Sequence, residues 1–313
     1  MSTIVQRWMG RGHTIKESYT SSERLAGLID VTRPILTVMG ALGVASAAAL
    51  AYHGIPPWSQ CMAGILAALA AYAGIHAFND YVDSRRDVEC WPGRPIPSRR
   101  LTSMQVLAVA FLSFVVSLVL IWRFFNPVCL VVSLISLIMG CLYSATLRDR
   151  IGYLILPPIQ GTLWLCGWTA FAPETLFTSW MPWVLYIFSA AWQAGHIMVY
   201  SPLHPIRKVK GVKLTQVPAL FVKTTPRTAA LLGFIFLVVT LILGLYLGYY
   251  FRLGWLYLIP VLIMGIILLV IALRFVRDPE NFGKGIRAFS WAAYFNLTVR
   301  IFILLSVFLF FNI

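Results

Sequence analysis

Long apolar runs, separated by short polar segments, recur along the whole 313-residue chain. A helix needs about 20 mostly apolar residues to cross the hydrocarbon core of a bilayer. By that criterion the pattern predicts nine membrane-spanning helices, over residues 34–52, 60–79, 104–123, 127–145, 152–171, 180–200, 228–250, 254–274 and 288–312. Pro157 and Pro158 lie within the fifth of these spans and predict a kink there.

We therefore expect an all-α, polytopic membrane protein, with a cytosolic N-terminal segment (1–33) followed by a single transmembrane domain (34–313). The composition agrees, because 59% of the residues are hydrophobic and only 12% are charged, against about 25% charged in soluble domains. The five cysteines have no metal-binding spacing and lie mostly within or beside apolar runs, so we expect buried thiols.

The distribution of Lys and Arg orients the predicted helices. Of 25 such residues, 22 fall in the N-terminal segment and in the loops after the second, fourth, sixth and eighth spans. Positive residues mark the cytosolic side, and the net charge of +14 indicates contact with anionic lipid. The expected membrane is the endoplasmic reticulum in a eukaryote or the inner membrane in a bacterium. Neither a nucleic-acid nor a protein partner is predicted.

Acidic side chains are scarce, and four of the chain's 11 fall between residues 80 and 89. Asp80, Asp83 and Asp87 recur at i, i+3 and i+7, so they would share one face if a helix continued through what we expect to be a cytosolic loop, 79–87. Carboxylates stacked in this way repel one another unless a cation joins them. Mg²⁺ prefers such hard oxygen ligands, together with substrate phosphates. The alternative is a solvated helix end whose charges are matched by neighbouring arginines.

Three motifs give the chain a resemblance to a known family. Asn79-Asp80-Tyr81-Val82-Asp83, followed by Asp87 and by Arg94-Pro95-Ile96-Pro97, resembles the first aspartate-rich motif of the UbiA superfamily of intramembrane prenyltransferases. Tyr143-Ser144-Ala145-Thr146-Leu147-Arg148 resembles an element of the next cytosolic loop in that family, and Arg33-Pro34 is similar to its N-terminal entry.

The resemblance implies a helical bundle around a central cavity that opens to the cytosolic side, where Mg²⁺ and an isoprenoid diphosphate bind. It implies Asn79, Asp83 and Asp87 as metal ligands. The residues that it implies at the reacting centre are Asp80, Asp83, Asp87 and Tyr143. Those that it implies in contact with the diphosphate are Arg33, Arg94 and Arg148.

The chain departs from the family after the sixth span, where members that transfer a prenyl group to an acceptor carry a second aspartate-rich motif. Residues 196–213 contain no carboxylate. Basic side chains of this loop are expected to bind the diphosphate instead, or serve as cytosolic anchors: Arg207, Lys208, Lys210 and Lys213. His196 and His204, in the same stretch, are either ligands or structural residues.

Ionisation of an allylic diphosphate gives a carbocation with two possible fates. Because the second motif is missing, the sequence favours intramolecular attack, which predicts a membrane-bound terpene cyclase acting on farnesyl diphosphate. The alternatives are a UbiA-type prenyltransferase that uses an aromatic or other acceptor, and a UbiA-like membrane protein without catalysis. Aromatic faces stabilise carbocations, and those expected to line the cavity are Trp164, Trp168, Trp192, Trp291 and Tyr294.

Arg300 lies within the last predicted span, four residues after Asn296. This spacing places the two side chains on one helix face, which we expect to be turned into the bundle. The favoured interpretation is a structural pair bound to a backbone carbonyl, and the alternative is a role in the cavity.

Overall fold

The computed structural model describes residues 18–148, 155–200 and 225–310, and within these ranges the chain is helical, with no β-strand. The long helices are α2 (Ser21–Thr32), α3 (Pro34–Tyr52), α4 (Trp58–Cys90), α5 (Ser103–Phe124), α6 (Pro127–Leu142), α8 (Leu156–Thr169), α9 (Met181–Tyr200), α11 (Pro226–Tyr250), α12 (Gly254–Arg277) and α13 (Phe282–Phe310). A π-helical turn, Tyr143–Leu147, extends α6, and a short 3₁₀ turn, Pro173–Thr175, follows α8.

The nine predicted spans correspond to the nine helices from α3 to α13 in the described part of the chain. Seven helical stretches there are long and apolar enough to cross a bilayer, and α8 and α9 pack between them. The prediction of an all-α, polytopic membrane fold is confirmed, and the chain is a multi-pass integral membrane protein.

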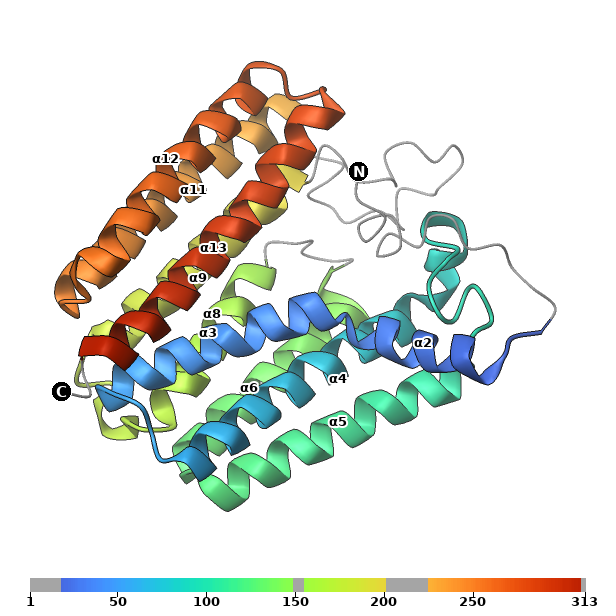
Figure 1. Cartoon of the computed structure of the whole chain (residues 1–313). Coiled ribbons are helices and arrows are strands. Elements are labelled where there is room, and N and C mark those ends of the chain that lie inside the picture. The colour runs from blue at the N-terminus through green and yellow to red at the C-terminus, as the bar shows by residue number, and fades with distance from the viewer. Residues whose placement is uncertain (1–17, 149–154, 201–224, 311–313) are drawn as a thin grey trace.

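The membrane helices form a closed ring in the order of the sequence. Each of them packs on the next, and α13, the last, packs on α3, the first. Figure 1 shows the result, with α5 along one edge of the bundle and α11 and α12 along the other. A large apolar core joins α3, α8, α9, α11, α12 and α13.

The acidic segment 79–87 is not a loop, so that prediction was wrong. α4 continues without a break to Cys90. Its 33 residues span about 50 Å, well beyond the roughly 30 Å hydrocarbon core. The last turns of α4 therefore carry the aspartates out of the core on a rigid helix.

The predicted kink at Pro157 and Pro158 is also absent from the described part of this span, which begins at residue 155. Both prolines lie in the first turn of α8, where the backbone N–H groups have no intrahelical partner and the fixed φ of proline suits the helix. They begin the helix and do not bend it.

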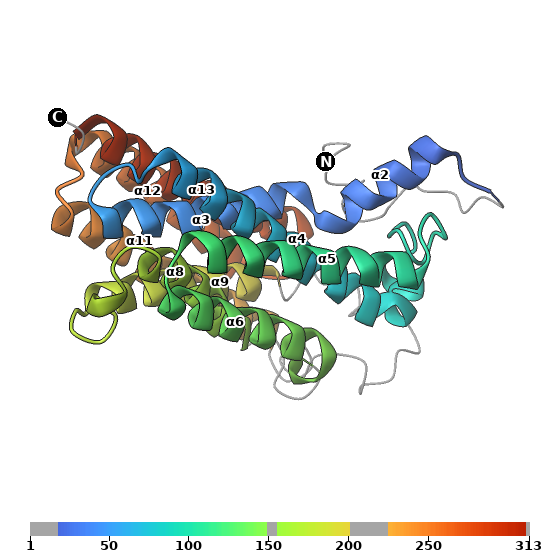
Figure 2. The same cartoon turned by 90° about the horizontal axis from the view of Figure 1, so that it is seen from below.

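The N-terminal segment contains α2, which the sequence analysis did not predict. The side chain of Thr20 accepts a hydrogen bond from the backbone N–H of Glu23, and the Glu23 carboxylate accepts one from the N–H of Thr20, so α2 begins with a full capping box. α2 packs on α4, and both views place it at the end of the bundle where α4 ends (Figures 1 and 2).

Close packing of α3 on α8 depends on Gly167. A Cβ atom at this position would stand 2.2 Å from the backbone oxygen of Val44, an atom that can move only if the helix moves. We expect Gly167→Ala to lower the thermal unfolding midpoint of the purified protein by several degrees, because overpacking costs about 1–3 kcal/mol. Gly244→Ala is the matched control, since its Cβ would lie 3.5 Å from Phe188. Equal midpoints for the two variants would contradict this packing.

Candidate active site

Three aspartates form the centre of the site, on the last turns of α4. Asp80, Asp83 and Asp87 share one helix face, and their exposed fractions are 4%, 4% and 1%. Buried carboxylates are unfavourable unless they are paired or hydrogen-bonded. Each of the three is paired with arginine, and the arginines come from four different segments of the chain.

The first arginine, Arg33, lies between α2 and α3. Its backbone has a left-handed conformation, with φ of 47°, which ends α2 and turns the chain into α3 at Pro34. A left-handed residue other than glycine costs about 1–2 kcal/mol. The side chain donates to Asp80 Oδ1 and, at 3.2 Å, to Asn79 Oδ1. The turn therefore aims a guanidinium at the acidic face of α4.

Arg94, in the turn after α4, bridges two of the aspartates. Its Nη1 atom lies 3.3 Å from Asp80 Oδ1 and 2.6 Å from Asp87 Oδ2. Burial by itself lowers the pKa of Arg94, but the carboxylates of Asp80, Asp87 and Asp83 outweigh it and raise that pKa above its ordinary value. The guanidinium therefore stays charged.

Arg148 holds Asp83 with two hydrogen bonds, of 2.7 and 2.5 Å, to the two carboxylate oxygens. It directly follows the π-helical turn and lies over the ring of Tyr143, 5.7 Å from its centroid. Single π-helical turns often mark functional sites. Here the turn brings Arg148 onto the acidic face, and Arg86 adds a further ion pair to Asp83 at 2.7 Å.

The carboxylate oxygens of the cluster could bind Mg²⁺ together with phosphate oxygens of a substrate. Arg94 Nη1 already stands as a cationic centre between Asp80 and Asp87, and one oxygen of each, Asp80 Oδ2 and Asp87 Oδ1, accepts no hydrogen bond from the described residues. No group of three His, Cys, Asp or Glu side chains in the described ranges is arranged to hold a metal by itself. Mg²⁺ commonly takes one or two carboxylates and completes its shell with phosphate oxygens.

The structure thus brings together most of the residues that the sequence singled out: Asn79, Asp80, Asp83, Asp87, Arg33, Arg94, Arg148 and Tyr143. Asn79 binds Ser144, at 3.3 Å, and Arg33 through its side chain. The metal assignment of Asn79, Asp83 and Asp87 stays a prediction. Arg207, Lys208, Lys210, Lys213 and His204 lie outside the described residues.

The sequence analysis missed Arg100 and Asp30, which fix the loop beside the site. Arg100 donates to Asp30 Oδ2 of α2 at 2.5 Å, and to the carbonyl of Gly93 at 2.9 Å. This ties the turn that carries Arg94 to α2. It also missed Tyr72 and His76, although their spacing continues the acidic face of α4 towards the membrane.

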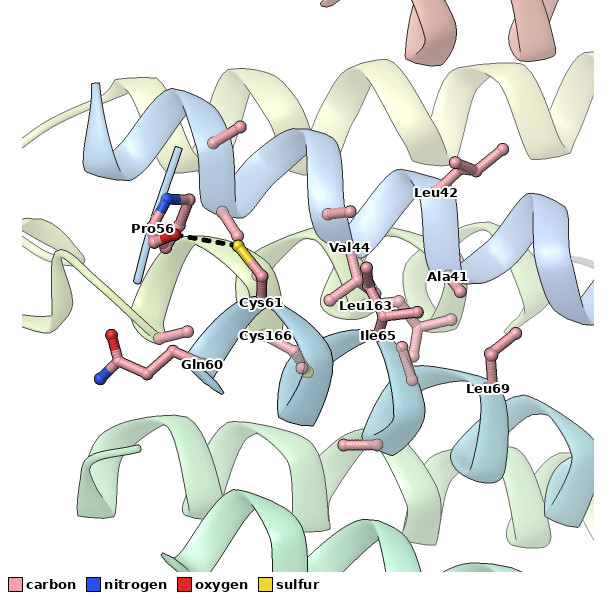
Figure 3. A pocket seen from close by; sticks show the side chains of 18 of the residues that line it. Ala41, Leu42, Val44, Pro56, Gln60, Cys61, Ile65, Leu69, Leu163 and Cys166 are labelled. Atoms are coloured by element: carbon pink, nitrogen blue, oxygen red, sulfur yellow. Dashed lines mark hydrogen bonds between the residues drawn. The ribbon is translucent and has the colours of Figure 1, made fainter. Parts of the chain in front are cut away.

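An apolar cavity of about 510 Å³ lies within the bundle, between α3, α4, α5, α6, α8 and α13. It extends from Tyr72 to Gln60 along α4, which corresponds to about 18 Å of helix. Figure 3 shows its wall, with Pro56, Gln60 and Cys61 at one end, Ala41 and Leu69 at the other, and Val44 and Leu163 between them. Tyr72, at the inner end, lies two turns of α4 from Asp80.

The aromatic residues expected to line this cavity do not do so. Trp164, Trp168 and Trp192 are buried in the helix packing, and Tyr294 is 54% exposed on the outer surface. The rings that line the cavity are Tyr72, Phe125, Phe171 and Phe308. Most of the wall is Ala, Val, Leu and Ile.

The Asp83–Arg148 pair gives a direct test of the cluster. We expect Asp83→Ala to lower the unfolding midpoint strongly, because removal of one partner of a buried ion pair costs about 3–5 kcal/mol. Asp83→Ala with Arg148→Ala should recover part of the loss, since the remaining charge is removed as well. Asp278→Ala breaks an exposed pair with Lys284 and should change the midpoint little. Additive losses in the double variant would contradict direct pairing.

Known proteins are similar to most of this chain. Protoheme IX farnesyltransferase of Cutibacterium acnes is 25% identical over 240 residues, 73% of this chain and 67% of that protein. Digeranylgeranylglyceryl phosphate synthase of Methanosarcina barkeri is 31% identical over 38% of this chain and 41% of its own length. 4-Hydroxybenzoate octaprenyltransferase of Vibrio campbellii is 24% identical over 61% of this chain and 67% of its own.

Solved structures share the fold. A UbiA homologue from Aeropyrum pernix superposes with a TM-score of 0.69 and 16% identity over 88% of this chain and 98% of its own. One from Archaeoglobus fulgidus, bound to GPP and Mg²⁺, superposes with a TM-score of 0.56 and 12% identity over 89% of this chain and 99% of its own. The model of the UbiA prenyltransferase family matches residues 38–298. The chain therefore belongs to the UbiA prenyltransferase family.

Proposed function

We propose that this protein is a Mg²⁺-dependent prenyltransferase that moves a prenyl group from an isoprenoid diphosphate to an acceptor, on the cytosolic side of its membrane. The observation that carries the proposal is the buried cluster of three aspartates and their arginines at the end of α4. Two of the relatives are by name a farnesyltransferase and an octaprenyltransferase. A structural neighbour was solved with GPP and Mg²⁺.

The cluster can bind a metal diphosphate by an exchange of partners. Arg33, Arg94 and Arg148 now neutralise the aspartates, and the same guanidinium groups match the spacing of phosphate oxygens. When bound, Mg²⁺ would neutralise charge on the leaving diphosphate. Asp80 and Asp87 would hold it, and the arginines released from them would turn to the phosphates. Positive charge next to the leaving group stabilises the transition state of ionisation.

The basic loop after α9 would complete this binding. Arg207, Lys208, Lys210 and Lys213 follow α9 in the sequence and would supply charge to the diphosphate in a chain that has no second aspartate-rich motif. Tyr143, beside Arg148, would position that guanidinium.

The apolar cavity would hold the isoprenoid tail. Its wall of Ala, Val, Leu and Ile side chains favours a hydrocarbon over a polar ligand. Because Tyr72 and Asp80 share one face of α4, a diphosphate at the aspartates directs its tail towards the inner end of the cavity.

The transferase is favoured over the terpene cyclase that the missing second motif suggested. A cyclase must guide a carbocation through several positions, which aromatic faces stabilise. The cavity wall carries four aromatic rings among 34 lining residues, and none is a tryptophan. The relatives also transfer prenyl groups to acceptors by name.

The proposal predicts activity that needs both a metal and an acceptor. Purified protein should release diphosphate from farnesyl or geranylgeranyl diphosphate only with Mg²⁺ and an acceptor, and a chelator should abolish turnover. Asp80→Ala and Asp87→Ala should each lower kcat/KM at least a hundredfold, about 2.7 kcal/mol in transition-state free energy, because each removes one of the two carboxylates proposed here to hold Mg²⁺. Diphosphate release is measured by a coupled phosphate assay, and prenylated products by mass spectrometry.

Asp278→Ala, at a surface pair with Lys284, is the control and should keep full activity. A volatile hydrocarbon formed without any acceptor would establish the cyclase instead. Full activity in Asp80→Ala and Asp87→Ala would show that these two aspartates take no part in the reaction.

Arg94 offers a second test that depends on geometry and keeps the charge. We expect Arg94→Lys to raise the KM for the diphosphate about tenfold, since lysine cannot form two parallel hydrogen bonds to a phosphate. Arg99→Lys, five residues away in the same loop but without a described contact to the aspartates, is its control. An unchanged KM in Arg94→Lys would mean that Arg94 has a structural role and does not bind the diphosphate.

A further inference from the structure

Arg94 lies in the connection between α4 and α5, residues 91–102, which consists of turns and bends. A side chain on such a segment binds a ligand in one geometry only if other contacts hold its backbone. A displacement of a binding group by about 1 Å can lower a rate about a hundredfold. The contacts that hold this connection therefore bear directly on what Arg94 can do.

Arg100 fixes the backbone beside Arg94. Its side chain is buried, and its Nη2 donates to the carbonyl of Gly93, the residue before Arg94, at 2.9 Å. Its Nε donates to Ser98 Oγ at 3.2 Å. The backbone N–H of Ser98 in turn donates to the carbonyl of Arg94 at 2.9 Å. The carbonyl groups before and after the Cα atom of Arg94 are thus both hydrogen-bonded, the first of them by Arg100.

Asp30 of α2 orients the guanidinium of Arg100. Its Oδ2 accepts from Arg100 Nη1 at 2.5 Å. Its backbone carbonyl accepts from the N–H of Arg33 at 3.2 Å, in the turn that ends α2. Asp30 is therefore linked through its side chain to the connection that carries Arg94, and through its backbone to Arg33. Arg33 and Arg94 are the two arginines that pair with Asp80.

Apolar packing holds α2 against the same connection. Val31 is fully buried in a small cluster that is separate from the large core of the bundle and also contains Ala77, Leu101, Val106 and Ala110. A Cβ atom on Gly27 would stand 3.3 Å from Leu101 Cγ, so the backbone of α2 lies close to the connection. The apolar cluster brings α2 near the site, and the directional contacts of Asp30 fix its position there.

We propose that Asp30 and Arg100 are positioning residues for diphosphate binding. Through the carbonyl of Gly93 they would hold the backbone of Arg94, so that its guanidinium meets the phosphate oxygens when it leaves Asp87. Neither residue would touch the substrate. This inference rests on the proposed function, in which Arg94 binds the diphosphate, and it makes α2 a working part of that site.

Diphosphate affinity tests the proposal. The full-length protein is titrated with inorganic diphosphate and Mg²⁺ by calorimetry, and KM and kcat are measured with a prenyl diphosphate and an acceptor. We expect Asp30→Ala to raise the Kd and the KM about tenfold and to leave kcat nearly unchanged, because binding is lost equally in the ground state and the transition state. Asp30→Glu keeps the carboxylate at a partly exposed position and should recover most of the affinity. Unchanged Kd and KM in Asp30→Ala would overturn the proposal.

A double-variant cycle separates an effect through Arg94 from a general loss of structure. If Asp30 acts through Arg94, Asp30→Ala with Arg94→Lys should raise the Kd about tenfold, and not about a hundredfold as two independent effects would. Arg100→Lys keeps the charge but cannot bind Asp30, Ser98 and Gly93 together, so it should give the same loss and the same non-additivity. Additive effects in both cycles would overturn the proposal.

The control is Asp278→Ala. The Asp278 side chain is 44% exposed and pairs with Lys284, as the 39% exposed side chain of Asp30 pairs with Arg100. Pairs with so exposed a partner add little to stability, so both variants should unfold within a few degrees of the wild type. Only Asp30→Ala should weaken diphosphate binding. Equal weakening in Asp278→Ala would contradict a positioning role.

The two proposals fail separately. Equal diphosphate binding in the wild type and Asp30→Ala would overturn the positioning role and leave the transferase intact. A wild-type protein that turns over with no acceptor tried would reject the transferase, while the titration would still test Asp30 and Arg100. A wild-type protein that does not bind diphosphate would reject both.

Discussion

The site depends on one interaction, the pairing of buried carboxylates on α4 with guanidinium groups from other segments. Asp80 binds Arg33 at the junction of α2 and α3, Asp87 binds Arg94 in the turn after α4, and Asp83 binds Arg148 after the π-helical turn. Each pair joins a different part of the chain to the same rigid helix. Without the arginines, three carboxylates within two turns would repel one another, and without the aspartates, three loops would lose their common support.

This arrangement has a functional meaning beyond stability. A buried ion pair contributes little net stability compared with apolar packing of the same volume, so its presence needs another reason. Under the proposed function, the arginines and aspartates would be the two halves of a binding site for a metal diphosphate, and each half holds the other in place. Ligand binding would then exchange partners between groups that are already desolvated and oriented, which lowers the reorganisation needed at the moment of reaction.

Much of this was predictable from the sequence, for identifiable reasons. Nine apolar runs predicted the membrane helices, because hydrocarbon thickness fixes their length. The spacing of Asp80, Asp83 and Asp87 predicted their common face. The helix that continues through them was predicted to be a loop, because four acidic residues and two arginines close together are typical of a polar segment. The bridge from Arg100 to Asp30 was not predictable, because it depends on tertiary contact between segments 70 residues apart. The prediction that the tryptophans line the cavity was wrong for the same reason, since the neighbouring helices decide whether an aromatic side chain faces lipid, core or cavity. The start of α2 could have been recognised from Thr20 and Glu23, whose spacing is that of a capping box.

The order of the ring bears on how the protein is made. Since each helix packs on its successor, the chain can assemble in the order of its synthesis. The segment from α2 to α6 already contains the pairs of Asp80 with Arg33 and of Asp87 with Arg94. Arg148, which pairs with Asp83, follows soon after α6 in the chain. The seam between α3 and α13 closes only when the last helix arrives. Arg300 enters the membrane with that helix, and its carbonyl partner, Met39, belongs to the first. The bilayer interior must therefore accommodate this charge until α13 packs on α3, at the cost of a charged side chain within the membrane.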